Sequence, residues 1–238
     1  HPPPLRRQRQ MCIRDRENGE LQARLDKMNI IFTGSKYSAC SNTWNKNLCK
    51  TILNENSINT PNSILLNNLK NCSNNPFDCF EKKFGYKPNL FMKPCEDGSS
   101  IDIFKISNDE DYKKAKLNCL NLEREFIFEE SIEGREFTVT IIGNKCYPVI
   151  EIKTQNDFYD YDAKYISDDT ILDQAKLSDN ELKIINDIAL RAFHALKCSG
   201  WARVDIIQDI NGNFNVIEIN TVPGTVSYTH LRAHETDT

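Results

Sequence analysis

The chain of 238 residues lacks several features that would settle its class at once. It has no run of about 18 apolar residues that could cross a membrane as a helix. Its basic N-terminal stretch has no apolar core, unlike a secretory signal. None of its 9 cysteines is spaced C-x-x-C, and no Cys/His cluster indicates zinc. The net charge of −4 gives no basic footprint for nucleic acid. Scattered thiols in such a chain indicate a reduced, cytoplasmic protein.

The common phosphate-binding motifs are also missing. The sequence has neither G-x-x-x-x-G-K-[ST] nor G-x-G-x-x-G, so a P-loop and a dinucleotide-binding turn of the usual kind are both excluded. Lys93 nevertheless precedes the small turn Gly98-Ser99-Ser100, whose N–H and hydroxyl groups could hold phosphate oxygens beside the lysine charge. That motif is weak by itself, because many loops contain it.

The two ends differ in kind from the rest of the chain. Residues 6–16 read RRQRQMCIRDR and residues 226–236 read VSYTHLRAHET, and each corresponds to one reading frame of a widely used tagmentation adapter. We therefore treat 1–16 and 226–238 as adapter-derived and leave them out of fold reasoning. The alternative is a natural basic arm and polar tail. Removing these ends takes away three of the four histidines and leaves a more acidic chain.

The remaining residues mix helical and strand patterns, which predicts an α+β fold. We expect helices at 42–53, 110–120 and 178–198, and strands at 63–66, 90–93, 101–106, 126–129, 137–142, 147–152, 202–207 and 214–219. The runs 126–129, 137–142 and 147–152 are divided by Glu133-Gly134 and Gly143-Asn144, and we expect them to be antiparallel strands. In the third helix Ser178 and Glu181 form a capping box, and Gly200 is expected to end it. His194 on this helix is expected to be structural or exposed.

The strongest physical signal is a hairpin of two acidic strands. Asn211-Gly212 is a favoured turn, and a symmetric loop centred on it places Asp205 opposite Glu218 and Arg203 opposite Asn220. Two opposed carboxylates repel each other, so we expect a cation between them. The oxygens of Asp, Glu and Asn suit Mg²⁺. A solvated pair at an exposed edge and a salt bridge with Arg203 are the alternatives.

Five motifs occur in an order that resembles one family, the D-alanine–D-alanine ligases of the ATP-grasp superfamily. They are Lys93-Pro94-x-x-x-Gly98-Ser99-Ser100, Glu129-x-x-Ile132-x-Gly134-x-Glu136, Phe158-Tyr159-Asp160-Tyr161-x-Ala163-Lys164-Tyr165, Gly200-x-Ala202-Arg203-Val204-Asp205 and Glu218-Ile219-Asn220-Thr221-x-Pro223-Gly224. The resemblance covers essentially all of residues 17–225. It implies an ATP-grasp fold in which two α+β subdomains grip ATP.

The resemblance also implies roles for single residues. The groups expected to hold ATP are Lys46, Lys93, Ser100, Glu129 near the adenine, Glu136 at the ribose, and Lys164. Those expected at the reacting atoms are Ser99 and Tyr165 around the first D-alanine and Arg203 at the acyl-phosphate and tetrahedral intermediate. The Mg²⁺ ligands implied are Asp205, Glu218 and Asn220, with Mn²⁺ as an alternative metal, and Gly224 lies where the second substrate is held.

The implied organisation is a remnant of an N-terminal α/β substrate domain at 17–44 and an ATP-grasp domain at 45–225. The latter divides into a central subdomain, about 60–135, and a truncated catalytic subdomain, about 136–225. The implied activity is ATP-dependent joining of two D-alanines for peptidoglycan synthesis, in the cytoplasm, with a homodimer expected from the family and no nucleic-acid or membrane partner. Because both ends of the family pattern are replaced, we expect this chain to be poorly active.

Two positions depart from the family pattern, and three readings compete. Asp102 replaces a glycine and is expected to crowd the phosphate loop or add charge near it, whereas Glu130 has no interpretation from sequence. One alternative is a sister ligase that joins D-alanine to D-lactate or D-serine, although Tyr165 favours an amine acceptor. The others are a non-catalytic ATP-Mg-binding fragment and a different ATP-grasp carboxylate–amine ligase, which residues 158–165 disfavour.

Overall fold

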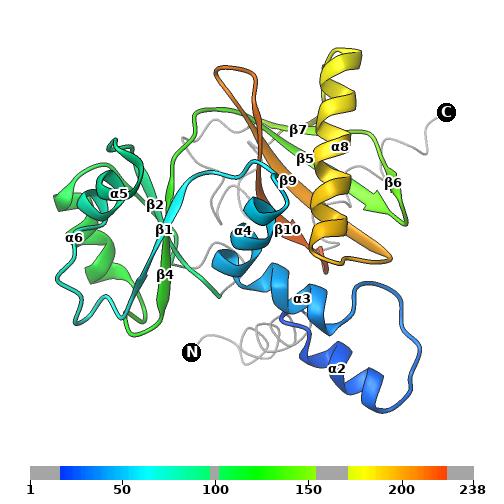
Figure 1. Ribbon diagram of the computed structural model, residues 1–238, viewed down its shortest axis with the longest axis horizontal. Coiled ribbons are helices and arrows are strands. Elements are labelled where there is room, and N and C mark those ends of the chain that lie inside the picture. Colours follow the sequence, from blue (N-terminus) through cyan, green and yellow to red (C-terminus); the bar gives the residue numbers. More distant parts are fainter. Residues whose placement is uncertain (1–16, 97–101, 154–170, 224–238) are drawn as a thin grey trace.

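The computed structural model describes residues 17–96, 102–153 and 171–223, which form an α+β structure of two lobes (Figure 1). The described helices are α2 (Glu20–Lys27), α3 (Tyr37–Trp44), α4 (Lys46–Glu55), α5 (Pro76–Phe84), α6 (Asp109–Asn118) and α8 (Asp179–Ala195). The described strands are β1 (Ser63–Asn67), β2 (Leu90–Pro94), β3 (Phe104–Ile106), β4 (Glu125–Glu130), β5 (Gly134–Ile142), β6 (Lys145–Cys146), β7 (Ile150–Lys153), β8 (Ile171–Gln174), β9 (Trp201–Asp209) and β10 (Phe214–Asn220). The predicted α+β class is confirmed.

The smaller lobe is a sheet of order β1-β4-β2-β3 packed against α5 and α6. Phe80 of α5 and Tyr112 of α6 meet Phe126 and Phe128 of β4 in one apolar core. Asn75 and Asn108 cap the two helices by accepting hydrogen bonds from backbone N–H groups of their first turns. This core fixes β2 and β4, the strands that carry Lys93 and Glu129.

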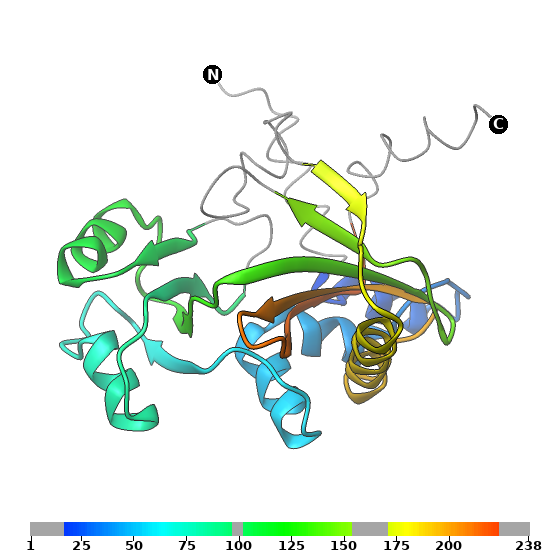
Figure 2. The same cartoon turned by 90° about the horizontal axis from the view of Figure 1, so that it is seen from above.

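The larger lobe is a sheet of order β10-β9-β5-β7-β8, with β6 paired to β5, and α8 lies across one face (Figure 1, Figure 2). Residues of even number in β9, such as Val204 and Ile206, join Ile185 and Ala189 of α8 in the core. The odd-numbered residues of β9 therefore lie on the opposite face. That face carries the predicted metal site. No helix within the described ranges is long and apolar enough to cross a membrane.

Several predicted elements need correction. The expected helix 42–53 is two helices that break at Asn45, whose side chain caps α4 by accepting from the N–H of Leu48. Helix α5 was not predicted. The predicted antiparallel strands on either side of Gly143-Asn144 are confirmed, since β5 pairs with β7. The strands on either side of Glu133-Gly134 do not pair with each other, because β4 pairs with β1 and β2 in the other sheet. The 130–134 connection therefore passes from one lobe to the other.

Helix α8 begins as predicted and ends earlier than predicted. The Ser178–Glu181 capping box is present, and His194 is exposed. The helix stops at Ala195 because Lys197 adopts φ +59°, the left-handed conformation common just after a helix. Gly200 does not end it. Gly200 instead lets the chain approach Gly34, since a Cβ at residue 200 would lie 2.7 Å from the Cα of Gly34.

Candidate active site

The predicted carboxylate pairing is present in the β9–β10 hairpin. Glu218 pairs with Asp205 and Asn220 pairs with Arg203, as expected. The turn itself differs from the prediction. Near the turn Phe214 pairs with Gln208, one residue out of the expected register, and a β-bulge at 217 restores the register before Glu218. The expectation is therefore correct at the site, although the loop is not centred on the Asn-Gly pair.

The bulge also determines which side chains of β10 reach the site. Phe214 and Val216 are buried in the core on the α8 side, and beyond the bulge Ile219 is buried there instead. The extra residue at 217 therefore changes the buried positions from even to odd numbers. Glu218 and Asn220, which unbroken alternation from Phe214 would bury, lie half-buried on the site face.

The Asp205 carboxylate is the centre of a polar cluster from three strands. Arg203 donates from Nε to Oδ1 at 2.9 Å and from Nη2 to Oδ2 at 2.7 Å. Thr138 of β5 donates its hydroxyl to Oδ1 at 2.7 Å. Asn220 donates from Nδ2 to Oδ2 of Asp205 at 3.1 Å and to Oε1 of Glu218 at 3.4 Å. The salt bridge with Arg203, offered as an alternative to metal, is thus present in this structure.

The same cluster fits a hard divalent cation. Asp205 and Glu218 present carboxylate oxygens on one face, and the group that now lies between them is the partly positive end of the Asn220 amide. Turning that amide over would present its oxygen as a third ligand. Among the described residues no group of three His, Cys, Asp or Glu side chains is placed to hold a metal. An oxygen set of two carboxylates and one amide suits Mg²⁺ or Mn²⁺ rather than zinc.

A second ionic cluster is buried beside the strands of the smaller lobe. Glu129 is 4% exposed and forms ion pairs with two lysines, Lys50 at 2.7 Å and Lys93. Lys50 also donates to the Thr60 hydroxyl at 2.7 Å and the Pro61 carbonyl at 2.8 Å. Two ammonium groups on one carboxylate leave a net positive charge. Such a site is well suited to an anion.

The ionisation of this triad follows from its surroundings. Burial alone would raise the pKa of Glu129, but attraction to Lys50 and Lys93 outweighs it and the pKa is lowered. Burial lowers the pKa of Lys50, and Glu129 offsets that shift only in part. Lys50 was missed from the sequence. The sequence signal that could have indicated a buried lysine is its position between the apolar residues Cys49 and Leu53, which the structure shows to be buried.

Glu17 is a further acid near Glu218 and Arg203 of the carboxylate cluster. Burial and the charge of Glu218 raise the pKa of Glu17 to about 7, against the opposing effects of Lys46 and Arg203. Glu218, Lys46 and Arg203 therefore lie within electrostatic range of Glu17. Lys46, expected at the phosphates, is half-buried at the first position of α4, where its N–H donates to the Cys95 carbonyl at 2.9 Å.

The remaining expected residues are placed as follows. Glu136 of β5 pairs with Ile152 and Ile207, on the same face of the sheet as Thr138. The expected residues Ser99, Ser100, Lys164, Tyr165 and Gly224 lie outside the described residues.

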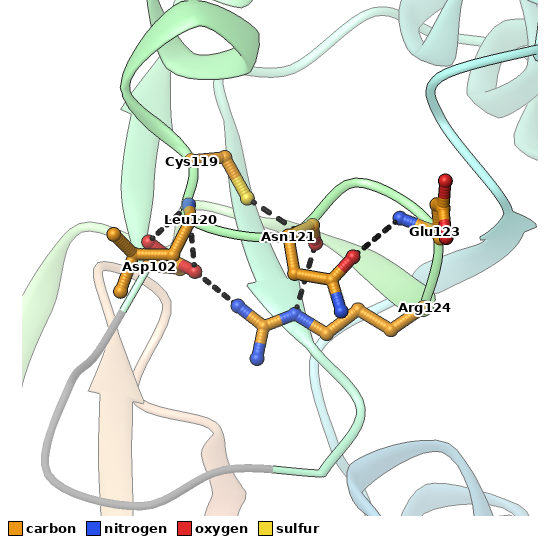
Figure 3. A network of polar contacts seen from close by, with 6 residues as sticks. All are labelled: Asp102, Cys119, Leu120, Asn121, Glu123 and Arg124. Carbon is orange, nitrogen blue, oxygen red and sulfur yellow. Dashed lines mark hydrogen bonds and ion pairs between the residues drawn. The ribbon is translucent and has the colours of Figure 1, made fainter.

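Both departures from the family pattern now have a structural account. The negative charge of Asp102 is paired. Its carboxylate forms an ion pair with Arg124 and accepts a hydrogen bond from the N–H of Leu120 (Figure 3). Glu130 accepts from the N–H of Asn62 at 2.7 Å and from the hydroxyl of Tyr86. Glu130 therefore ties β4 to the start of β1.

The sequence is similar to a family of known proteins. A family model described as "D-ala D-ala ligase C-terminus" matches residues 52–235. The D-alanine–D-alanine ligases of Marinomonas sp. (strain MWYL1) and Pseudoalteromonas translucida (strain TAC 125) are 36% and 35% identical over 89% and 87% of this chain. The chain spans 66% of the length of each.

Solved structures give the same family and its fold. D-alanine–D-alanine ligase from Bacillus anthracis complexed with ATP has a TM-score of 0.72 and 27% identity, covering 87% of this chain and 65% of that one. VanG D-Ala:D-Ser ligase from Enterococcus faecalis has a TM-score of 0.76 and 25% identity, covering 89% and 62%. The fold is ATP-grasp, and the chain belongs to the D-alanine–D-alanine ligase family, of which it carries the C-terminal part.

Proposed function

We propose that this chain is the ATP- and metal-binding part of a ligase that joins two D-alanines for peptidoglycan synthesis. The observation that carries the proposal is the placement of Asp205, Glu218 and Asn220 on one face of a hairpin, beside Arg203. The D-alanine–D-alanine ligase of Bacillus anthracis, similar over most of this chain, was solved with ATP. ATP and D-alanine are therefore the proposed substrates.

The proposed reaction has two steps. The carboxylate of one D-alanine takes the γ-phosphoryl group of ATP and becomes an acyl-phosphate. The amine of a second D-alanine then attacks the acyl carbon and phosphate leaves. When bound, Mg²⁺ would offset negative charge on the phosphates. Asp205, Glu218 and Asn220 would hold it.

Arg203 is proposed to stabilise the oxyanion of the tetrahedral intermediate. Its guanidinium is held against Asp205 by three N–H contacts of 2.7 to 3.2 Å, so its orientation is fixed before substrates bind. A donor that is already oriented needs little reorganisation when charge develops. Thr138 fixes the other partner of this pair, Asp205, from β5.

Lys50 and Lys93 are proposed to supply positive charge to the ATP phosphates. Glu129 keeps both ammonium groups together although each is almost fully buried. Lys46 and Glu136 keep the phosphate and ribose roles that the resemblance implies, as do Ser100 and Lys164 at the phosphates. Ser99 and Tyr165 at the first D-alanine and Gly224 at the second substrate stay predictions of the same kind.

A second candidate function is ligation of D-alanine to D-serine or D-lactate. Its specific support is the likeness to VanG D-Ala:D-Ser ligase, at a TM-score of 0.76. Tyr165, which favours an amine acceptor, lies outside the described residues. A comparison of D-alanine, D-serine and D-lactate as second substrates, across pH, separates these activities.

We also propose a cytoplasmic location, because ATP is the proposed substrate and the cysteines of the described segments are free thiols. The homodimer implied by the family is a proposal that sedimentation of the purified chain tests.

The test of the proposed function is phosphate release from ATP and Mg²⁺, with and without D-alanine. It is run on the 238-residue chain and on a chain whose ends are restored from the genomic locus. We expect D-alanine-dependent release from the restored chain, abolished by Glu218→Gln and kept in Asp187→Asn, which alters an exposed acid of α8. ATP binding without release from either chain would support a non-catalytic module instead.

A further inference from the structure

Lys50 lies in a helix that packs on the larger lobe, and its ammonium group contacts the smaller lobe. Its neighbours in α4, Cys49 and Leu53, are buried in the core that also contains residues of α8 and β9. The Lys50 ammonium forms an ion pair of 2.7 Å with Glu129 of β4, in the sheet of the smaller lobe. Helix α4 lies between the two lobes (Figure 1). The Lys50–Glu129 ion pair therefore joins the lobes.

The N–H groups of this ammonium are all directed into the protein. An ammonium group has three donors. Besides the Glu129 carboxylate, Lys50 donates to the hydroxyl of Thr60 at 2.7 Å and to the carbonyl of Pro61 at 2.8 Å. The residue is only 4% exposed. Lys50 therefore adds positive charge near a bound phosphate, but its donors are already used within the protein.

The two backbone and hydroxyl acceptors lie where the chain passes from one lobe to the other. Residues 59–62 connect α4 to β1. The first of them is attached to the larger lobe, since the N–H of Val216 in β10 donates to the Asn59 carbonyl at 2.8 Å. The last is attached to the smaller lobe, since the N–H of Asn62 donates to Glu130 of β4 at 2.7 Å. The ammonium group holds the two residues between these attachments.

The same ion pair reaches a residue of the proposed nucleotide site. Lys93 of β2 forms an ion pair with the carboxylate of Glu129, and β2 pairs with β4. Asp205 and Glu218, the proposed metal ligands, belong to the larger lobe. A Mg²⁺-nucleotide held by both sets of groups would contact both lobes. Its binding would then depend on how the lobes are fixed relative to each other.

We propose that Lys50 is a positioning residue, a strut between the lobes that fixes Lys93 relative to the carboxylate cluster of β9 and β10. The inference rests on the proposed function, because only a nucleotide bound by both lobes would need this alignment. The strut donates no hydrogen bond to the substrate. It acts by holding the 59–62 connection and the Glu129 carboxylate to one point of α4.

Amide hydrogen exchange of the purified 238-residue chain tests the strut without a nucleotide. Lys50→Met keeps an unbranched side chain and removes the charge and the three donors. We expect the N–H groups of Asn62 and Glu130, which join the connection to β4, to exchange at least about tenfold faster, because charged hydrogen bonds that hold the connection are lost. The N–H groups of α8 are expected to keep their native rates. General destabilisation would accelerate exchange in both regions.

Calorimetric titration with Mg²⁺-β,γ-imido-ATP distinguishes a strut from a phosphate ligand. Thr60→Val removes one acceptor and leaves the Lys50–Glu129 ion pair in place. A strut predicts weaker binding of the analogue in both variants, by about tenfold in Lys50→Met and about threefold in Thr60→Val. A lysine that donated to the phosphates would bind them at least as well in Thr60→Val, because one of its N–H groups is released.

Two matched controls accompany these variants. Glu55→Gln removes one charge at an exposed position of α4, and is expected to keep native exchange and native binding. Thr60→Ser keeps the hydroxyl and is expected to do the same. Thermal melts identify a variant that fails to fold. If Lys50→Met does not fold, the comparison of Thr60→Val with Thr60→Ser decides the question.

Two results would contradict the strut alone. One is native exchange at Asn62 and Glu130 in Lys50→Met. The other is native binding by Thr60→Val together with weakened binding by Lys50→Met, a pattern that makes Lys50 a phosphate ligand. No binding of the analogue by the native chain contradicts the proposed function, and the exchange rates then still decide whether Lys50 joins the lobes.

Discussion

Thr138 donates its hydroxyl hydrogen to Oδ1 of Asp205 across the pairing of β5 with β9, at 2.7 Å. Both side chains are buried. Arg203 and Asn220 hold the same carboxylate from β9 and β10, so Thr138 fixes it from the third strand. The orientation that Asp205 would offer to the proposed cation therefore depends on a hydroxyl group that is not itself an expected ligand.

We expect Thr138→Val to weaken metal binding, because valine keeps the branched shape and removes the hydroxyl. Loss of a group that orients a metal ligand typically lowers affinity by about 10- to 100-fold. Mn²⁺ titration followed by electron paramagnetic resonance measures this without turnover. Thr138→Ser keeps the hydroxyl and serves as the control. Native Mn²⁺ affinity in the valine variant would remove Thr138 from the support of the site.

The bulge at 217 predicts a difference between two single-residue deletions. Deleting Ile217 removes the extra residue and leaves Glu218 and Asn220 on the site face, since Val216 and Ile219 then alternate regularly with them. Deleting Ile219 removes a buried side chain and turns Asn220 toward the core. We expect the first variant to fold and bind Mn²⁺.

The second deletion is expected to lose Mn²⁺ binding and at least about 2 kcal/mol of unfolding free energy, the usual cost of removing a buried isoleucine side chain. Urea unfolding and the same Mn²⁺ titration measure both effects. Equal behaviour of the two deletion variants would show that the bulge does not set the direction of the β10 side chains.

The sequence was sufficient to predict the pairing of Asp205 with Glu218 because these residues are close along the chain. Asp205 and Glu218 belong to one hairpin, so turn position and strand alternation predict their pairing. The bulge was not foreseen, because nothing in the residues around Ile217 distinguishes one extra residue in β10 from a longer turn. The predicted pairing of Asp205 with Glu218 is still correct, because the bulge offsets the one-residue shift in register near the turn.

Contacts between distant segments could not be predicted in this way. Glu129 meets Lys50 only because α4 packs beside the smaller lobe, and Asp102 meets Arg124 only because the chain returns after α6. Periodicity gives the direction of a side chain within an element and not its partner in another. The position of Lys50 between the apolar residues Cys49 and Leu53 was the one local sign.

The buried triad predicts a definite acid dependence of stability. The pKa of Glu129 is lowered in the folded protein, so its contribution to stability is complete above the unfolded value of about 4.5 and is lost as pH falls through the lower folded value. We expect Glu129→Gln to cost about 3 to 5 kcal/mol at pH 7, because it leaves two lysines buried without their carboxylate.

Urea unfolding of this variant should also depend less on pH below about 4.5 than unfolding of the native chain does. The control is Glu125→Gln, an exposed acid on the same strand, which is expected to retain both the stability and the acid dependence. A Glu129→Gln variant as stable as the native chain at pH 7 would mean that the two lysines do not need their shared partner.

The end of α8 predicts a stabilising substitution. Lys197 is exposed and adopts φ +59°, which costs a non-glycine residue roughly 1 to 2 kcal/mol. Lys197→Gly removes that strain, and the greater freedom of glycine in the unfolded chain offsets about 0.4 to 1 kcal/mol of the gain. We expect a net stabilisation of about 0.5 kcal/mol in urea unfolding.

Lys183→Gly, an exposed position inside the same helix, should instead destabilise by about 1 kcal/mol. Opposite signs in the two variants would establish that α8 ends through the left-handed residue 197 rather than at Gly200, whereas a loss of stability in both would show that the Lys197 side chain makes a contact worth more than the strain.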